Sequence, residues 1–190
     1  MSASKAARGA KSSRRYVALL RAINVGGHTV RMERLRAIFE SLGFTAVSTF
    51  IASGNVIFES AIPKTAEIET TLENRLCTEL GYEVATFIRT GAELETIVAQ
   101  DPFDGRVTEG WAMWVGFVRI PPTADAEKKL MSLSTPVDSF VIVGREIYWL
   151  RKPGESDPKL SGAKIDKALG MQSTFRNITT VRKLAALTKA

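Results

Sequence analysis

Residues 16–59 read YVALLRAINVGGHTVRMERLRAIFESLGFTAVSTFIASGNVIFE, and this stretch decides the fold class. Its apolar pattern predicts a short strand over 16–21, then a helix that Thr29 caps and Gly43 ends. Two runs rich in β-branched and aromatic residues follow and flank Ser53-Gly54-Asn55, which is typical of a hairpin turn. The stretch therefore predicts a strand, a helix and two more strands, in that order.

The same alternation continues to the end of the next strand. Thr65 caps a second predicted helix, in which apolar residues recur at helical spacing from Ile68 and Leu72 onward. Gly81 ends this helix, and residues 83–89 read as a further strand. The resulting order, βαββαβ, is the split βαβ pattern of a ferredoxin-like unit.

Residues 91–158 follow this order of elements more loosely. A strand at 111–120 precedes a helix and a hairpin that turns at Gly144-Arg145. No repeat of the sequence itself is evident between the two stretches, so a duplication rests on the order of elements alone. Two helices, 161–169 and 177–188, are expected to close the chain.

These elements predict an α+β fold with two ferredoxin-like (βαββαβ-type) halves followed by C-terminal helices. The chain has 190 residues and 45% apolar residues, which suits one domain or two small ones with a packed core. The predicted domains are a basic mobile tail (1–15), a first half (16–90), a second half (91–158) and basic C-terminal helices (159–190).

The net charge of +6 is unevenly distributed along the chain. Residues 1–15 contain five basic residues and no acid, and residues 159–190 contain seven basic residues and one acid. The intervening residues, 16–158, therefore carry 14 basic and 19 acidic side chains. This distribution excludes a uniformly basic nucleic-acid binder but leaves a local basic patch at the C-terminus as an alternative.

Cysteine usage and hydropathy indicate the compartment. The single cysteine, Cys77, allows no internal disulfide. No apolar run approaches the roughly 20 residues that span a bilayer, and the basic N-terminus lacks the apolar segment of a secretory signal. We therefore expect a cytoplasmic protein that does not enter a membrane.

Three motifs resemble a known family. They are Leu20-Arg21-Ala22-Ile23-Asn24-Val25-Gly26-Gly27, then Ser53-Gly54-Asn55-Val56, then Thr174-Phe175-Arg176-Asn177-Ile178-Thr179-Thr180-Val181. In this order they resemble the uncharacterised, mainly bacterial family catalogued as domain of unknown function 1697. The resemblance runs from about Tyr16 to the C-terminus and implies an α+β fold of ferredoxin-like pieces, with site positions but no known reaction. The chain departs from the family pattern at Ala22, where glycine is common, and at Ile178, where tryptophan is common.

The first motif allows two interpretations. Asn24 to Gly27 follow a strand, so their backbone N–H groups could hold an anion together with Arg21 at the start of the next helix. The alternative is a tight turn in which Asn24 bonds its own backbone. A pair of glycines, Gly26 and Gly27, is neither a Walker loop nor a dinucleotide fingerprint.

The other two motifs allow the same pair of interpretations. Ser53 has no visible partner base, so a binding role for Asn55 or a plain hairpin turn explains that motif better than catalysis. Arg176 could grip a phosphate or carboxylate at a helix N-terminus, or could pair with a surface carboxylate while Asn177 caps the last helix. If Arg21 and Arg176 converge, they repel unless an anion lies between them.

The remaining candidate residues favour structural roles. His28 is the only histidine and has no evident partner for metal binding or acid–base work. We expect Cys77 to be a small buried residue of the second helix. Asp101 and Asp104 suit a turn, and the aromatic residues of the second half suit a core better than a base-stacking platform.

The first hypothesis is a protein that binds a small anionic, or phosphate-bearing, ligand in a cleft between its halves. The residues that would line or shape the cleft are Arg21, Asn24, Gly26, Gly27, Ser53, Asn55, Arg176 and Asn177. Two alternatives stay open: a nucleic-acid-binding module that uses Lys164, Lys167, Arg176, Arg182, Lys183 and the basic tail, and a protein interaction domain. No general base is identified, so the pattern assigns no catalytic residue, and it indicates no metal, no cofactor and no oligomeric state.

Overall fold

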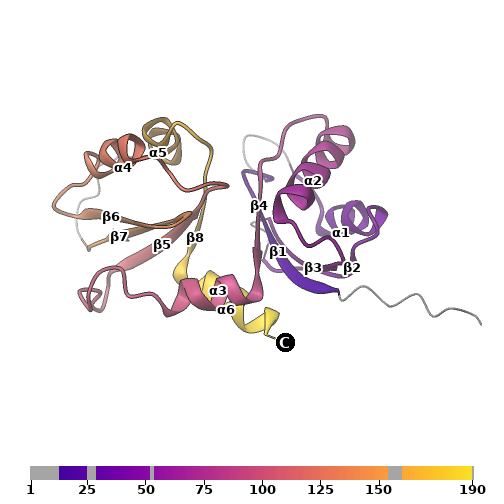
Figure 1. Ribbon diagram of the computed structural model, residues 1–190, viewed down its shortest axis with the longest axis horizontal. Helices are drawn as coiled ribbons and strands as arrows, with labels where there is room; N and C mark the ends of the chain where they lie inside the picture. The colour runs from indigo at the N-terminus through magenta and orange to yellow at the C-terminus, as the bar shows by residue number, and fades with distance from the viewer. Residues whose placement is uncertain (1–12, 25–28, 52–53, 154–159, 190) are drawn as a thin grey trace, which may run out of the picture.

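The computed structural model describes residues 13–24, 29–51, 54–153 and 160–189. Within these residues the chain forms two four-stranded antiparallel sheets and six helices, so the fold is α+β (Figure 1). We call the elements from β1 to α3 the first half and those from β5 to α6 the second half. The predicted tail lies outside the described residues except for 13–15.

The first half contains one sheet, with two helices on one of its faces (Figure 1). The strands lie in the order β2-β3-β1-β4, and every neighbouring pair is antiparallel. Its elements are β1 (Arg14–Leu20), α1 (Met32–Ser41), β2 (Thr45–Thr49), β3 (Asn55–Ser60), α2 (Thr65–Leu80), β4 (Thr86–Thr90) and α3 (Gly91–Ala99).

For α1 and α2 the predicted C-terminal ends are confirmed and the predicted N-caps are wrong. Gly43 and Gly81 follow α1 and α2 with φ of 81° and 79°, as a left-handed C-terminal residue requires. The N-caps predicted for these two helices, Thr29 and Thr65, are not used, because α1 begins after Arg31 and α2 after Lys64, neither with a side-chain cap hydrogen bond. Helix starts are less sharply encoded here than helix stops, since glycine alone adopts the left-handed conformation freely.

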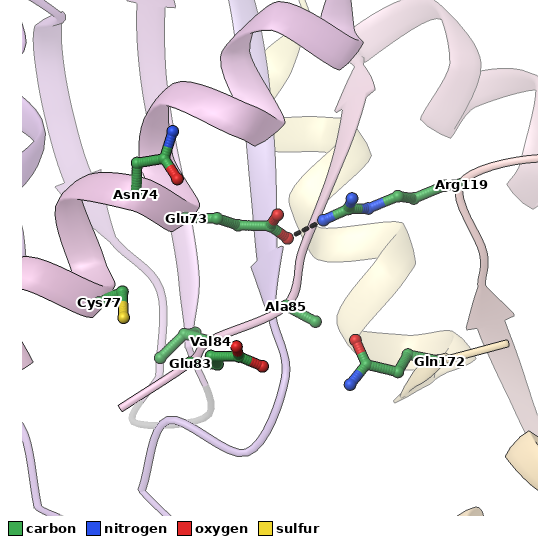
Figure 2. Close-up of a pocket in the computed structure, with 8 residues that line it drawn as sticks. All are labelled: Glu73, Asn74, Cys77, Glu83, Val84, Ala85, Arg119 and Gln172. Carbon is green, nitrogen blue, oxygen red and sulfur yellow. Dashed lines mark hydrogen bonds and ion pairs between the residues drawn. The ribbon is translucent and has the colours of Figure 1, made fainter. Parts of the chain in front are cut away.

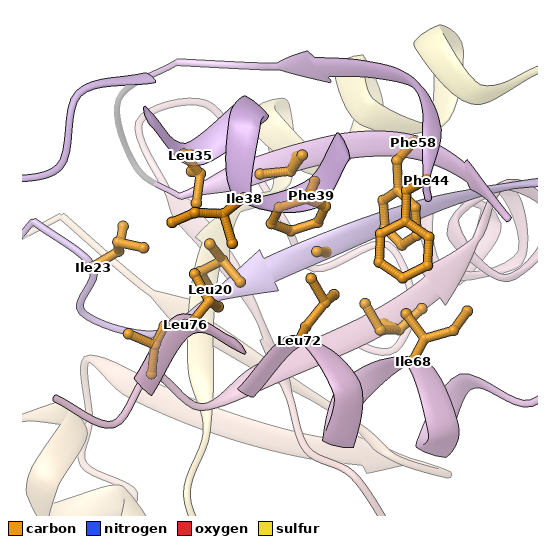
Figure 3. Close-up of a cluster of buried hydrophobic side chains, with 14 of the residues drawn as sticks. Leu20, Ile23, Leu35, Ile38, Phe39, Phe44, Phe58, Ile68, Leu72 and Leu76 are labelled. Carbon is orange, nitrogen blue, oxygen red and sulfur yellow. The ribbon is translucent and has the colours of Figure 1, made fainter. Parts of the chain in front are cut away.

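The core of the first half lies between its sheet and α1 and α2 (Figure 3). Leu20 of β1 and Phe58 of β3 face Phe39 of α1 and Leu72 of α2. The spacing of four residues between Ile68 and Leu72 places both on the buried side of α2, as the sequence predicts.

The second half repeats this arrangement. Its strands lie in the order β6-β7-β5-β8, again with antiparallel neighbours. Its elements are β5 (Ala112–Phe117), α4 (Ala124–Met131), β6 (Asp138–Val143), β7 (Glu146–Arg151), α5 (Gly162–Leu169), β8 (Thr174–Asn177) and α6 (Ile178–Thr188).

One predicted feature of the C-terminal segment is wrong. The sequence predicts only helices after residue 159, whereas Thr174–Asn177 forms β8 and pairs with β5. Four residues are too few for an alternating pattern to be recognised, and the pairing is long-range. The segment 159–190 therefore completes the second sheet, while the predicted domain boundaries stay a prediction.

A shared core joins the two halves. The face of β1 that is turned away from α1 and α2 contributes Val17 and Leu19, and β5 contributes Val115 and Phe117 to the same buried cluster. Helices α3 and α6 pack together at the base between the sheets and complete this cluster (Figure 1). No helix of the described residues is both long and apolar enough to cross a bilayer.

Candidate functional site

The three sequence motifs meet at the side chain of Arg176. Its Nε donates to Asn55 Oδ1 at 2.6 Å, its Nη2 to the Leu20 carbonyl at 2.9 Å, and its Nη1 to Thr174 Oγ1 at 2.8 Å. The side chain is 8% exposed, although it lies more than 100 residues from either of the other motifs. The three motifs, which are far apart in the chain, therefore meet at one buried side chain.

Arg21 lies beside this junction but faces a carboxylate. Its Nε donates to the Ser173 carbonyl at 3.0 Å, and its Nη2 lies 2.5 Å from Asp166 Oδ2. Arg176 is buried, and burial lowers its pKa to about 10, so the guanidinium stays charged at neutral pH. The expected open hollow between two unpaired guanidiniums is not what these contacts form, and ligand binding by either arginine stays a prediction.

The asparagines of the motifs hold backbone groups. Asn24 Oδ1 accepts the Val30 N–H at 2.7 Å, and Asn177 Oδ1 accepts the Thr179 N–H at 2.9 Å. Asn177 is thus the N-cap of α6, as predicted. Gly26, Gly27, Ser53 and His28 lie outside the described residues.

Gly54 explains why its motif needs glycine. Its φ is 74°, and a Cβ at this position would lie 2.8 Å from Ile23 Cγ2 and 3.2 Å from the Leu20 carbonyl oxygen. The absence of a side chain lets the β2–β3 turn approach the end of β1. This approach brings the Leu20 and Gly54 carbonyls together on Arg176 Nη2.

A cavity of about 290 Å³ opens between the halves, next to this junction (Figure 2). It is bounded by α2 and the approach to β4 on one side, and by the residues that follow β5 and precede β8 on the other. A second cavity of about 270 Å³ shares Arg119 and Gln172 with it. The first cavity is lined by Glu73, Asn74, Cys77, Glu83, Val84, Ala85, Arg119 and Gln172.

Arg119 is the cation of this cleft. It pairs with Glu73 across the two halves (Figure 2), and its side chain is 42% exposed. Glu73 Oε1 also accepts the Thr86 N–H at 2.7 Å, so its carboxylate has a second partner. The cleft therefore contains one ion-paired arginine and the exposed carboxylate of Glu83.

Cys77 corrects one prediction. The sequence predicts a buried residue, but Cys77 is exposed and lines the cleft. Leu76 occupies the buried side of α2, and the next residue lies about 100° further round the helix. The helical period, applied strictly, would have placed Cys77 outside.

Carboxylates of α2 and α3 also cover the outer edge of β4. Glu69 accepts the Ile88 N–H at 2.9 Å and Glu93 accepts the Thr90 N–H at 2.7 Å. Together with the bond from the Thr86 N–H to Glu73, they occupy the N–H of every second residue of β4. Burial raises the pKa of Glu69, against the opposing effect of the Ile88 N–H and nearby arginines. The edge of β4 is therefore blocked against pairing with another strand.

The cleft residues escaped the sequence analysis because they carry no motif. One signal could have found Arg119: Trp114-Val-Gly-Phe-Val-Arg119 repeats the pattern of Tyr16-Val-Ala-Leu-Leu-Arg21. A sequence repeat is therefore present, but it is only six residues long and identical at two positions, Val17 with Val115 and Arg21 with Arg119. Strand register makes the correspondence plain, because Val17 pairs with Arg89 and Val115 pairs with Arg176.

The cations proposed for nucleic-acid binding do not share one surface. Lys164 and Lys167 are on α5, and Arg182 and Lys183 are on α6. These helices pack on opposite faces of the second sheet, in two different core clusters (Figure 1). Arg176 is buried, as described above. Among the described residues no group of three or more His, Cys, Asp or Glu side chains is placed to hold a metal ion.

Comparison with known proteins identifies the family. The model of a family described as "Protein of unknown function (DUF1697)" matches residues 14–148, which is more than half of the chain. The chain belongs to the DUF1697 family. The match contains the first two motifs of this DUF1697 chain and ends within β7, before the third. No curated protein matches the chain in sequence.

A solved structure supports the fold of this DUF1697 member. The conserved bacterial protein SP0830 from Streptococcus pneumoniae is 24% identical, with a TM-score of 0.72 over 94% of this chain and 100% of that chain. At this identity the likeness shows the fold alone. The family and its solved relative therefore leave the activity to be inferred from the cleft.

Proposed function

We propose that the protein binds a small ligand with an anionic group, such as a phosphate or carboxylate, in the cleft between its two halves. The observation that carries this proposal is the position of Arg119, which is partly exposed in a cavity of about 290 Å³. Arginine binds such groups through two parallel N–H donors. Both halves supply walls, so the ligand would contact both.

The exchange of partners at Arg119 supports the proposal. An incoming anionic group would replace Glu73 on the guanidinium, while Glu73 keeps its hydrogen bond from the Thr86 N–H. The exposed side chains of Asn74 and Gln172 would supply directional hydrogen bonds. The carboxylate of Glu83 would disfavour a ligand that is anionic throughout and favour one with a single anionic group.

The motif residues take a shaping role in this proposal. Arg21, Asn55 and Arg176 connect the halves behind the cleft, and Asn24 and Asn177 fix the adjoining turns. Gly26, Gly27 and Ser53 belong to the same motifs and lie outside the described residues. We propose the cytoplasm as the compartment, because a free, exposed Cys77 suits a reducing environment.

We also propose that each half has ferredoxin-like topology. The support is the element order βαββαβ and the spatial strand order 2-3-1-4 with antiparallel neighbours in both sheets. In such a sheet the first and third strands are central, as β1 and β3 are, and as β5 and β7 are.

A thermal-shift screen tests the binding proposal. Nucleotides, sugar phosphates and short carboxylates are added to the wild type, to R119Q and to R182Q, which removes an exposed arginine of α6 outside the cleft. We expect at least one anion to stabilise the wild type and R182Q by about 2.7 kcal/mol at a concentration of 100 times its Kd, and to lose this effect in R119Q. The proposal fails if no anion stabilises the wild type, or if R119Q responds as strongly as R182Q.

A further inference from the structure

Arg89 makes the same contacts in one half as Arg176 makes in the other. Arg89 is on β4, is 0% exposed, and its guanidinium reaches across to the second half. Its Nε lies 2.8 Å from Glu146 Oε1, and its Nη2 donates to the Val118 carbonyl at 2.9 Å. Arg176 is on β8, the strand at the corresponding position in the other sheet, and reaches across to the first half.

The carbonyl acceptors correspond atom for atom. Nη2 of each arginine donates to the carbonyl at the end of the other half's first strand, which is Val118 for Arg89 and Leu20 for Arg176. The same Nη2 also donates to the residue before the other half's third strand, at 3.3 Å to the Arg145 carbonyl and 3.4 Å to the Gly54 carbonyl. Nη1 of each donates to the carbonyl of the preceding residue, at 2.9 Å in both cases.

The side-chain acceptors correspond as well. Nε of Arg89 donates to Glu146, and Nε of Arg176 donates to Asn55. Glu146 and Asn55 are the first residues of β7 and β3. Glu146 pairs with Phe117, the last residue of β5, and Asn55 pairs with Leu19, the last but one of β1. The two acceptor oxygens therefore occupy corresponding positions in the two halves, although Glu146 is charged and Asn55 is neutral.

A second set of contacts is reciprocal in the same way. Arg119 of the second half pairs with Glu73, which accepts the Thr86 N–H at 2.7 Å. Arg21 of the first half pairs with Asp166, which accepts the Ser173 N–H at 3.0 Å. Glu73 is on α2 and Asp166 on α5, and each accepted N–H lies three residues before the buried arginine of its strand.

We propose that the two halves are copies of one unit and that they bind each other as the subunits of a two-fold dimer do, with Arg89 and Arg176 as reciprocal anchors. In a two-fold interface each contact occurs twice with the roles exchanged, and the four arginine contacts have this form. The proposal concerns the surface between the halves and does not depend on ligand binding in the cleft.

We expect the buried core between the halves to hold them together without a covalent connection. Separation of the halves would expose the apolar side chains of the shared core, including Leu19 and Phe117. It would also break the charge-assisted hydrogen bonds that join each guanidinium to acceptors of the other half. Buried arginines at the centre of an interface are typical anchors of binding.

Cleavage of the connection between the halves tests the proposal. A protease site inserted between Val107 and Thr108 lies in the exposed connection from α3 to β5 and leaves the buried Phe103 untouched. After native cleavage of the full chain we expect one species by size exclusion with light scattering, with the mass of the 20.8 kDa chain plus the insert. Two separate species, or aggregation on cleavage, would overturn the proposal.

Three variants of the cleaved protein test the anchors. R176Q removes one guanidinium, and E146A removes the acceptor of the other from the opposite half while it keeps Arg89. R182Q is the matched control on the exposed side of α6. We expect R176Q and E146A to raise the Kd between the fragments at least about tenfold, and R182Q to leave it within about twofold.

The two anchor variants fail in distinguishable ways. If R176Q unfolds before cleavage, E146A carries the test, because its substitution is a truncation in a partly exposed hairpin. Fragments that bind as tightly in both anchor variants as in R182Q would show that the arginines are not the anchors. Neither result changes the outcome of the ligand screen with R119Q, so the two proposals fail separately.

Discussion

Gly54 shows how much of the junction depends on one residue without a side chain. Its positive φ suits glycine, and the contact distance to Ile23 and Leu20 excludes a Cβ. The sequence predicts a turn at Ser53-Gly54-Asn55, and β2 and β3 do meet there. It does not predict the close approach to β1, because that contact joins residues more than 30 positions apart.

Gly54→Ala separates these two effects when it is compared with Gly43→Ala. Both glycines have positive φ, but a Cβ at Gly43 meets nothing within 4 Å. We expect Gly43→Ala to lower the free energy of unfolding by about 1 kcal/mol through backbone strain alone. Gly54→Ala should cost roughly 1–3 kcal/mol more, because Ile23 and Leu20 must also move. Urea denaturation of both variants measures the difference, and equal losses would contradict the packing argument.

Glu69 gives a pH-dependent prediction. Its buried carboxyl has a pKa above the ordinary value of 4.5, so the folded protein holds this proton to higher pH than the unfolded chain does. The stability that this group contributes is therefore full below pH 4.5 and is lost as pH rises through the folded pKa. Glu69→Gln keeps an oxygen that accepts the Ile88 N–H and removes the charge.

We expect E69Q to equal or exceed the wild type in stability at neutral pH, because it removes a buried charge. The advantage should disappear at about pH 4, where Glu69 is protonated in the folded wild type. Urea midpoints at the two pH values test this. A lower stability of E69Q at neutral pH would show that the charge itself stabilises the fold.

Among the elements, the sequence predicts helices better than it predicts the short edge strand β8. The stripe of Ile68, Leu72 and Leu76 predicts α2 and its buried face, because all the information is local. Strand β8 escapes prediction because its four residues gain their structure from pairing with β5. The burial of Arg176 escapes for the same reason, since its acceptors belong to other elements.

Helix α3 offers a test of an element through its N-terminus. Thr90 and Glu93 form a capping box, and Glu93 Oε1 lies 2.5 Å from Arg145 Nη2 in the second half. Burial alone would raise the pKa of Glu93, but the Thr90 N–H and Arg145 outweigh it and lower that pKa below 4.5. The stability that Glu93 contributes is therefore present above pH 4.5 and is lost as pH falls through the folded pKa.

E93Q should accordingly be less stable than the wild type at neutral pH, and the gap should narrow as the solution is acidified to about pH 3. Thermal unfolding over this range measures it. E95Q, which changes an exposed glutamate on the same helix, is the control and should show no such gap. A gap that widens on acidification would reverse the assigned direction of the Glu93 pKa.

At the scale of the whole molecule, the chain is two similar halves around a shared core. The order of elements predicts the α+β class and two sheets, which the structure has. It does not predict that α3 and α6 pack together or that a cleft lined by Arg119 opens opposite them, because both depend on how the halves meet. Of the eight predicted site residues, Arg21, Asn55 and Arg176 take part in contacts between the halves, and the part of all eight in binding stays a prediction.

Circular permutation tests the equivalence of the halves. Ser13 and Lys189 line one cavity, so a short linker can join them, and the chain can be opened between Val107 and Thr108. In the permuted chain the second half precedes the first half. We expect it to fold with a Tm within about 5 °C of the wild type, because every contact between the halves is kept. An insoluble or molten product, judged by circular dichroism and Tm, would contradict this equivalence.

Equilibrium unfolding followed by two probes at once tests whether the halves form one cooperative unit. The three tryptophans, Trp111, Trp114 and Trp149, lie in the second half or directly before it, and a dye on the single cysteine, Cys77 of α2, reports on the first half. If the shared core and the reciprocal arginines join the halves, both signals change at one urea concentration. Two separate midpoints would show that each half unfolds alone and would contradict the account.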